Sequence, residues 1–169
     1  MELDYESLKN ELLKALDANK IWVLATSDGS RVSARSMSIV HDGFDIYFQT
    51  SRHLEKYAQL TQNSNVALCC SNVSIEGVAI DAGSWEDNPA ARELYSKQHK
   101  GSYDAYGTSP GQGVIKVVPH YVVFWKYIDG QPARDFLYLT EQKAERLFYF
   151  DQYPKAEKIS RESRKPSIS

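Results

Sequence analysis

Hydroxyl groups and cationic side chains are concentrated in one stretch of the sequence, between residues 35 and 56. The stretch begins with Arg35, carries serines and a threonine in two strand-like segments, and ends with Lys56 early in a helical pattern. Arginine, lysine, hydroxyl groups and the free amides of a helix N-terminus are groups with which proteins bind a phosphate dianion. The stretch therefore indicates a phosphate site with Arg35 and Lys56 as its charged ligands.

The same residues also have a purely structural interpretation. Thr50 or Ser51 could cap the helix that follows, Arg35 could pair with a nearby carboxylate, and Lys56 could lie in solvent. Helix caps and solvated lysines are common, so the local pattern alone favours this interpretation over a phosphate site. Choosing between the two needs a further observation.

Hydrophobic periodicity and turn residues predict the elements that position this stretch. Asp28-Gly29 and Asp42-Gly43 tolerate the positive φ of tight hairpin turns, so the strands on either side of each pair should be antiparallel. We expect helices over 3–17, 53–62 and 86–107, the last as an insertion, and strands over 21–26, 31–41, 44–50, 66–71, 73–82, 114–128 and 135–139.

Many short antiparallel strands with few helices predict a mainly β (α+β) fold. Closure into a barrel removes the exposed strand edges that would otherwise aggregate. With 169 residues, 42% of them hydrophobic, the chain can bury one sizeable core. We expect a single domain over 1–154, followed by a flexible tail over 155–169, which lacks a periodic apolar face.

Composition and charge exclude several classes of protein. A formal net charge of -2 argues against nucleic-acid binding, which needs a basic excess. We find no apolar run long enough for a membrane span, and the acidic N-terminus is unlike a secretory signal, so we expect a cytoplasmic protein. The adjacent Cys69 and Cys70 and the dispersed histidines lack the spacing of metal ligands, so we expect no metal site.

Two segments of the sequence resemble one known family. The segment 23–68, which begins VLATSDGSRVSARSMSIVHDGFDIYFQTSRHLEKYAQL, is similar to the pyridoxamine 5'-phosphate oxidase-like family of FMN-binding split barrels. The segments PHYVVFW (119–125) and RDFLY (134–138) resemble the strands by which that family enters and leaves its flavin site. The matches follow one another in the family's order and cover most of the chain, so the fold that we expect is an antiparallel split β-barrel with peripheral helices.

The resemblance implies a homodimer with FMN in a groove between the protomers. Arg35 and Lys56 match phosphate ligands, and Thr50 matches a residue that touches the phosphate or ribityl chain. Trp125 matches a flavin-contacting tryptophan of the second protomer, although core packing is an alternative for a tryptophan in an apolar strand. The cofactor-binding residues implied are Arg35, Met37, Ser38, Gln49, Thr50, Ser51, Lys56 and Trp125; a flavin contact by Trp85 is less favoured.

The sequence departs from true pyridoxamine 5'-phosphate oxidases where those enzymes hold their substrate. Val40 stands in place of a lysine, and Gln131 and Ala133 stand in place of an arginine and a histidine. Valine and alanine cannot bind a phosphate or transfer a proton, so we do not expect vitamin B6 oxidation. Arg134 is one position from a flavin-contacting arginine, and such a shift would reverse its face on a strand.

The remaining similarity is to the general stress protein branch of the family. It implies an FMN-dependent oxidoreductase with an unknown small-molecule substrate and NADH or NADPH as a possible electron donor; flavin carries the redox chemistry, so we name no catalytic acid or base. One alternative is a flavin-binding or redox-sensing stress protein without turnover. Another is a split barrel that binds deazaflavin or haem, for which His41, His53, His99 or His120 would be the axial ligand.

Overall fold

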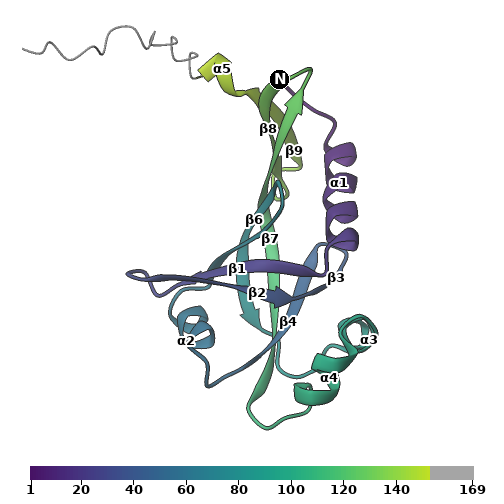
Figure 1. Ribbon diagram of the computed structural model, residues 1–169, viewed down its shortest axis with the longest axis vertical. Coiled ribbons are helices and arrows are strands. Elements are labelled where there is room, and N and C mark those ends of the chain that lie inside the picture. Colours follow the sequence, from purple (N-terminus) through teal and green to yellow (C-terminus); the bar gives the residue numbers. More distant parts are fainter. Residues whose placement is uncertain (153–169) are drawn as a thin grey trace, which may run out of the picture.

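The structure of the protein, a computed structural model, describes residues 1–152, so the expected tail over 155–169 lies outside the described residues. Strands form the body of the molecule, and the helices lie at its periphery (Figure 1). The helices are α1 (Tyr5–Ala18), α2 (Glu55–Gln62), α3 (Pro89–Gln98), α4 (Lys100–Tyr106) and α5 (Tyr149–Gln152). The strands are β1 (Ile21–Ser27), β2 (Val32–Ser38), β3 (Val40–Asp42), β4 (Asp45–Ser51), β5 (Asn65–Cys70), β6 (Val73–Asp81), β7 (Gln112–Ile128), β8 (Gln131–Tyr138) and β9 (Lys143–Phe148).

All neighbouring strands are antiparallel, and their order closes the sheet on itself. The order is β2-β1-β5-β6-β7-β4-β3, and β2 and β3 are successive parts of the chain separated only by Ile39. The last strand in the order therefore returns to the first, which makes a barrel. The predicted antiparallel barrel with peripheral helices is confirmed.

The strand predicted over 31–41 is interrupted at Ile39, and its two parts pair with different neighbours. The first part, β2, pairs with β1, and the second part, β3, pairs with β4. The side chain of Ile39 is 2% exposed, and its backbone N–H donates to the carbonyl oxygen of Lys20 at 3.0 Å. Because the chain changes partners here, β2 and the end of β4 diverge, and the barrel is split along that line.

Helix α1 is anchored to the main core by one apolar stripe. Leu8, Leu12 and Leu16 recur every four residues and are all buried, as the sequence pattern predicted. The helix begins after Asp4, whose carboxylate accepts a hydrogen bond from the Ser7 N–H at 2.7 Å. The buried leucines pack α1 against the sheet as part of the main core.

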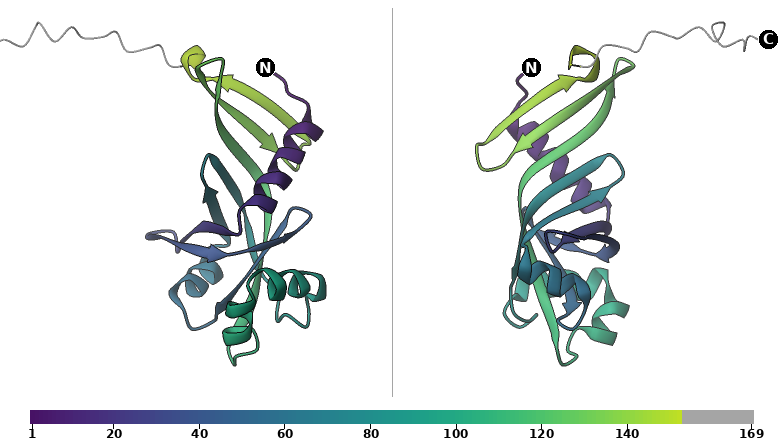
Figure 2. Two further views of the ribbon diagram at one scale, coloured as in Figure 1. Left: turned by 45° about the vertical axis from the view of Figure 1, so that its right-hand side comes forward. Right: turned by 90° about the vertical axis from the view of Figure 1, so that its left-hand side faces the viewer.

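Strand β7 is long enough to leave the barrel and to form an arm with β8 and β9 (Figure 2). Helix α1 covers one face of this arm. The first residues of the chain pair with the outer edge of β9, where the Leu3 N–H donates to the Ala144 carbonyl at 2.9 Å. Strand β9 was not predicted, and β8 begins at Gln131, earlier than the predicted 135–139.

Helices α3 and α4 occupy the predicted insertion and are held by a second, smaller core. This core consists of Val40, Trp85, Ala91, Tyr95 and Val114. It ties the insertion to β3 and to the start of β7, which places both helices beside the split in the barrel (Figure 1). Among residues 1–152, no helix combines the length and apolar composition that a bilayer crossing requires.

Candidate functional site

A cavity of about 380 Å³ lies in the split between β2 and β4. Its walls come from the end of β2, the end of β4, the start of α2 and the helical insertion. The residues that line it are Ser36, Met37, Ser38, Gln49, Thr50, Ser51, Leu54, Lys56, Tyr95, Ser102, Tyr106 and Gln112. Six of the eight residues expected to bind a cofactor are in this lining, and the exceptions are Arg35 and Trp125.

The strand edges at this cavity are free of partners from the sheet. Strand β3 pairs with β4 only as far as the Val40 and Tyr47 pair, so the end of β4 keeps β7 as its one neighbour. Among the described strands, β2 likewise pairs only with β1. Backbone groups of both edges therefore face the split, where they can bind a polar ligand.

Arg35 and Lys56 form a cationic centre at this site. Burial and the nearby charge of Arg35 lower the pKa of the Lys56 ammonium below its ordinary value. Neither side chain forms an ion pair within residues 1–152. Two adjacent cations without a carboxylate repel each other, and an anion placed between them would remove that repulsion.

The contacts of Arg35, Thr50 and Ser51 differ from those that the purely structural interpretation expects. Arg35 donates through Nη1 to the Thr26 hydroxyl at 2.7 Å and to the Leu24 carbonyl at 3.4 Å, and neither acceptor is a carboxylate. Leu54 is the N-cap residue of α2, and no side chain caps that helix. Thr50 and Ser51 therefore lie at the cavity without acting as the helix cap.

Gln49 lines the cavity, but its side-chain amide is engaged within its own chain. Its Oε1 accepts a hydrogen bond from Trp85 Nε1 at 2.9 Å, and its Nε2 donates to the carbonyl and the hydroxyl of Ser102. Trp85 is 1% exposed and packs against Tyr95 with ring centroids 4.7 Å apart. Trp85 was the less favoured candidate for a flavin contact, and in the structure it is a buried residue of the second core.

Three lining residues that the sequence analysis missed come from the helical insertion. Tyr95 is buried, its hydroxyl lies 3.3 Å from the Ser102 Oγ, and burial raises its pKa. Tyr106 is 60% exposed and lies at the rim of the cavity. The insertion was recognised as helical and rich in tyrosine, but no local pattern indicates which part of the barrel it covers.

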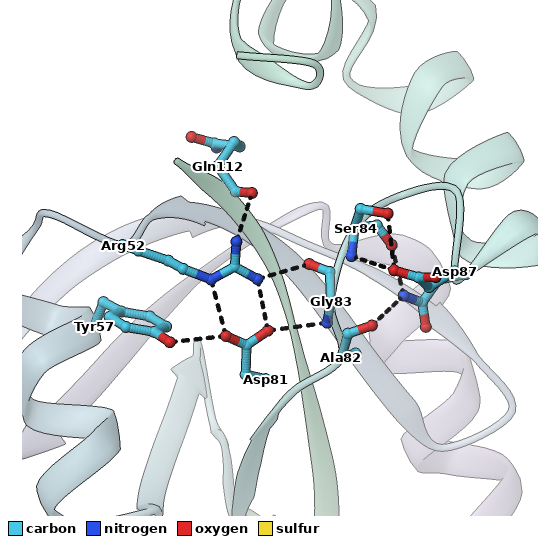
Figure 3. Close-up of polar contacts among 9 residues, drawn as sticks. Arg52, Tyr57, Asp81, Ala82, Gly83, Ser84, Asp87 and Gln112 are labelled. Carbon is cyan, nitrogen blue, oxygen red and sulfur yellow. Dashed lines mark hydrogen bonds and ion pairs between the residues drawn. The ribbon is translucent and has the colours of Figure 1, made fainter. Parts of the chain in front are cut away.

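A second arginine near the cavity is fully occupied by structural contacts (Figure 3). Arg52 forms two 3.0 Å contacts with the Asp81 carboxylate and donates to the carbonyls of Gly83 and Gln112. The Tyr57 hydroxyl donates to the same carboxylate at 2.8 Å. The hydrogen bonds from Arg52 lower the pKa of Asp81 to about 2 despite partial burial. This network joins α2 to the ends of β6 and β7, whereas Arg35 contacts no carboxylate within residues 1–152.

Trp125 does not lie in the cavity of its own chain. It is on the arm, 38% exposed, beside a shallow pocket that also contains Cys69 and Asn72. Its cross-strand partner is Arg134, so both side chains are on the same face of the sheet. Whether Arg134 replaces the flavin-contacting arginine of the family stays a prediction. A contribution from a second protomer stays a prediction.

The histidines considered as haem ligands lie elsewhere in the described part of the chain. None is among the residues that line the cavity. His41 contacts the Asp17 carboxylate at 2.7 Å and the Gly43 carbonyl at 2.8 Å, and His99 contacts the Ile39 carbonyl at 2.8 Å. Those two rings are committed to protein contacts.

Comparisons with known proteins give the family context of this site. The family model described as "Pyridoxamine 5'-phosphate oxidase" matches residues 8–126, which include every expected site residue. "General stress protein 26" of Bacillus subtilis (strain 168) is 33% identical over 64 residues, a match that covers 38% of this chain and 46% of that protein. The chain thus matches less than half of the length of this curated relative.

Solved structures share the fold at low sequence identity. General Stress Protein 26 from Bacillus anthracis str. Sterne has a TM-score of 0.60 at 22% identity, covering 78% of this chain and 98% of that one. A heme binding protein from Mycobacterium smegmatis has a TM-score of 0.63 at 17% identity, covering 77% and 57%. A FAD-binding protein from Mesorhizobium loti has a TM-score of 0.55 at 13% identity, covering 67% and 90%.

Proposed function

The chain belongs to the pyridoxamine 5'-phosphate oxidase family, and from this premise we propose that it is an FMN-dependent oxidoreductase whose flavin lies in the cavity between β2 and β4. Members of this family commonly bind flavin, and some bind haem instead. The observation that carries the proposal is the pair of unpaired cations, Arg35 and Lys56, beside a cavity lined by hydroxyl groups.

The residues present fit a flavin mononucleotide. Arg35 and Lys56 would hold the phosphate dianion through charge-assisted hydrogen bonds, which are stronger than bonds between neutral groups. The hydroxyls of Thr50 and Ser51 lie in the same lining and would bind the phosphate or the ribityl chain. The free backbone edges at Met37 and Ser38 would hydrogen-bond to the polar rim of the ring system. When bound, FMN supplies the electron-transfer chemistry, and this chain orients it and excludes water.

Haem is the second ligand that the structural neighbours suggest. A haem iron needs an axial side chain, and in the described residues no histidine lines the cavity. A phosphate, in contrast, matches the charge that is already there. These two observations favour FMN over haem for this chain.

A second copy of the chain would complete the site. The outer surface of the barrel exposes apolar side chains on three strands, where Ile21, Val23, Val78, Ile80 and Val118 are all more than one-third exposed. Val78 and Val118 are directly opposite each other in the sheet. Exposed apolar side chains on the barrel favour a homodimer, in which the partner would bring its own Trp125 to the flavin.

The substrate differs from that of a pyridoxamine 5'-phosphate oxidase. Val40 and Ala133, which replace substrate-binding positions of that enzyme, are both buried in the protein core. Gln131 is exposed at the far end of the arm. We propose a small organic acceptor and NADH or NADPH as the donor; the alternative is a flavin-binding sensor without turnover.

Flavin titration of purified protein tests the site. We expect FMN to be retained through gel filtration, and Arg35→Gln and Lys56→Gln each to weaken its binding by about 10- to 100-fold, because each removes a charge-assisted hydrogen bond. Lys97→Gln, which removes an exposed cation of α3, is the matched control. Unchanged FMN affinity in both site variants would contradict the proposal.

Anaerobic reduction of the bound flavin separates the enzyme from the sensor. NADH or NADPH is added to the FMN-loaded protein, and the visible flavin band is followed with time. Rapid bleaching supports an oxidoreductase with a nicotinamide donor. A band that persists with both nucleotides favours the flavin-binding protein without turnover.

A further inference from the structure

We propose that Thr26 and Gln59 are positioning residues that hold Arg35 and Lys56 at the separation that a flavin phosphate requires. The inference rests on the proposed function, because it takes the two cations as the phosphate site. Neither residue lines the cavity, and neither was selected from the sequence. Both side chains are polar and 2% exposed, which is unusual for residues without a structural or functional role.

A chain of hydrogen bonds runs from the barrel to Arg35. The Thr26 hydroxyl donates to Gln59 Oε1 at 2.5 Å and accepts from Arg35 Nη1 at 2.7 Å. Gln59 Nε2 in turn donates to the Ser33 hydroxyl at 3.2 Å. Because Nε2 of Gln59 donates to Ser33, the side-chain amide is held in one orientation with Oε1 toward Thr26. This orientation fixes the direction of the Thr26 O–H bond. With its proton directed at Gln59, the Thr26 oxygen can act toward Arg35 only as an acceptor.

Gln59 controls the position of Lys56 as well. The two residues are three apart on α2, and residues at that spacing share one face of a helix. Leu60, on the same face, is buried against the main core. The contact between Gln59 and Thr26 therefore sets how closely the Lys56 face of α2 approaches β1 and β2.

The arrangement needs such a restraint because its charges repel. Arg35 and Lys56 have like charge and no carboxylate between them, so without restraint the long side chains would turn apart into solvent. Within residues 1–152, the hydrogen bonds of the Arg35 guanidinium all run through Nη1, to Thr26 and Leu24. Its other N–H groups stay available for phosphate oxygens. Loss of the Thr26 hydroxyl would remove the shorter of the two restraints.

The inference predicts an effect that depends on the phosphate of the ligand. Riboflavin has the ring system and ribityl chain of FMN but no phosphate. We expect Thr26→Val and Gln59→Met each to weaken FMN binding by about tenfold, as loss of a hydrogen bond to a charged group does, and to leave riboflavin binding unchanged. The experiment measures both dissociation constants by quenching of flavin fluorescence in the full-length protein.

Three further variants make the test specific. Thr26→Ser keeps the hydroxyl and should restore the preference for FMN. Thr61→Val removes an exposed hydroxyl of the same helix, which donates only to the Ala58 carbonyl, and should change neither ligand. If Thr26→Val does not fold, Gln59→Met carries the test, because it leaves the Thr26 hydroxyl in place and removes its acceptor.

The possible outcomes separate this inference from the proposed function. A selective loss of FMN affinity, with recovery in Thr26→Ser, supports positioning through the phosphate site. Equal weakening of both ligands shows a general structural role and overturns the inference, as does no effect on either. If the wild-type protein binds riboflavin as tightly as FMN, the phosphate site itself is wrong, and the proposed function fails with it.

Discussion

Trp125 on β7 lies directly opposite Arg134 on β8, on the face of the arm that α1 does not cover. The guanidinium of Arg134 lies over the ring of Phe136 at 5.4 Å, and its Nε is buried without a hydrogen-bond partner in the described residues. A buried donor without a partner costs free energy. The exposed ring of Trp125 offers a stacking surface, and the proposed dimer would place the flavin of the second copy on it.

Substitution of Trp125 should therefore weaken FMN binding, although Trp125 is not in the cavity of its own chain. We expect Trp125→Ala to weaken it by about tenfold, the loss of one aromatic stacking contact with a ring. Tyr127→Ala is the matched control, since Tyr127 is on the same face two residues along and 70% exposed. Light scattering on both variants shows whether they keep the oligomeric state of the wild-type protein. A dimer whose FMN affinity is insensitive to Trp125 would contradict the contribution from the partner.

Replacement of Lys56 should stabilise the protein in the absence of flavin. The lowered pKa of Lys56 means that its charged form is disfavoured in the fold, first by burial and then by Arg35. Lys56→Met keeps the aliphatic chain and removes the charge, so we expect FMN binding to weaken while the free energy of unfolding rises by at most about 1 kcal/mol, because solvent screens the partly exposed side chain. Urea denaturation of the flavin-free protein measures this. Lys97→Met, at an exposed helix position, should leave the stability unchanged, and a destabilised Lys56→Met would show that Lys56 is a structural residue.

As the pH rises, FMN affinity should begin to fall at a lower pH than it would if Lys56 had the ordinary pKa of a lysine. Lysine loses its charge above its pKa, and the pKa of Lys56 is lowered from 10.5 by burial and by Arg35. As the pH rises through that lowered pKa, the site loses one of its two cations, and the phosphate is held less tightly. A titration of FMN affinity between neutral and alkaline pH measures the midpoint. Lys56→Arg should move the decline upward, because arginine remains charged over this range, and an unshifted midpoint would assign the decline to another group.

The parts of the fold that local signals specify were predicted well from the sequence. The Asp42-Gly43 pair gives the hairpin between β3 and β4, and the leucines of α1 recur every four residues, so both elements were found. Strand β9 was missed because its sequence, KAERLF, carries three charged residues, and one of them has its partner on another strand. Asp135, on the neighbouring strand, pairs with one of them, Arg146, and nothing in the sequence near β9 announces that contact.

The site was predictable in part for the same reason. Residues 35–56 form one contiguous stretch, and most of its expected ligands meet in one cavity. The break at Ile39 was not predictable, since it depends on a hydrogen bond to Lys20 across the barrel. The positions of Ser102 and Tyr106 at the cavity were not predictable either. They depend on the contact between Gln49 and Ser102, two residues that are distant in the sequence. Residue types indicated the chemistry of the site, and long-range packing decided which groups line the cavity.

The arm that carries Trp125 should depend on one buried carboxylate. Asp135 is fully buried and accepts hydrogen bonds from Lys126 at 2.9 Å and from Arg146 at 2.6 and 2.8 Å. Burial alone would raise the pKa of Asp135, but these hydrogen bonds outweigh it, and the pKa is lowered. The carboxylate therefore joins β7, β8 and β9 on the face opposite to Trp125.

Asp135→Asn leaves Arg146 without a carboxylate partner among the described residues and leaves Lys126 with Glu11 alone, and it should destabilise the protein by about 3 kcal/mol. Urea denaturation at neutral pH measures the loss, and Asp104→Asn, in an exposed pair with Lys100, is the control with an expected change near zero. Because the folded-state pKa of Asp135 is below its ordinary value of 3.8, its contribution is complete above that value and is lost as the pH falls through the folded-state pKa. The wild-type protein should therefore lose stability in acid more steeply than Asp135→Asn. Parallel acid profiles for the two proteins would show that the carboxylate does not hold the arm together.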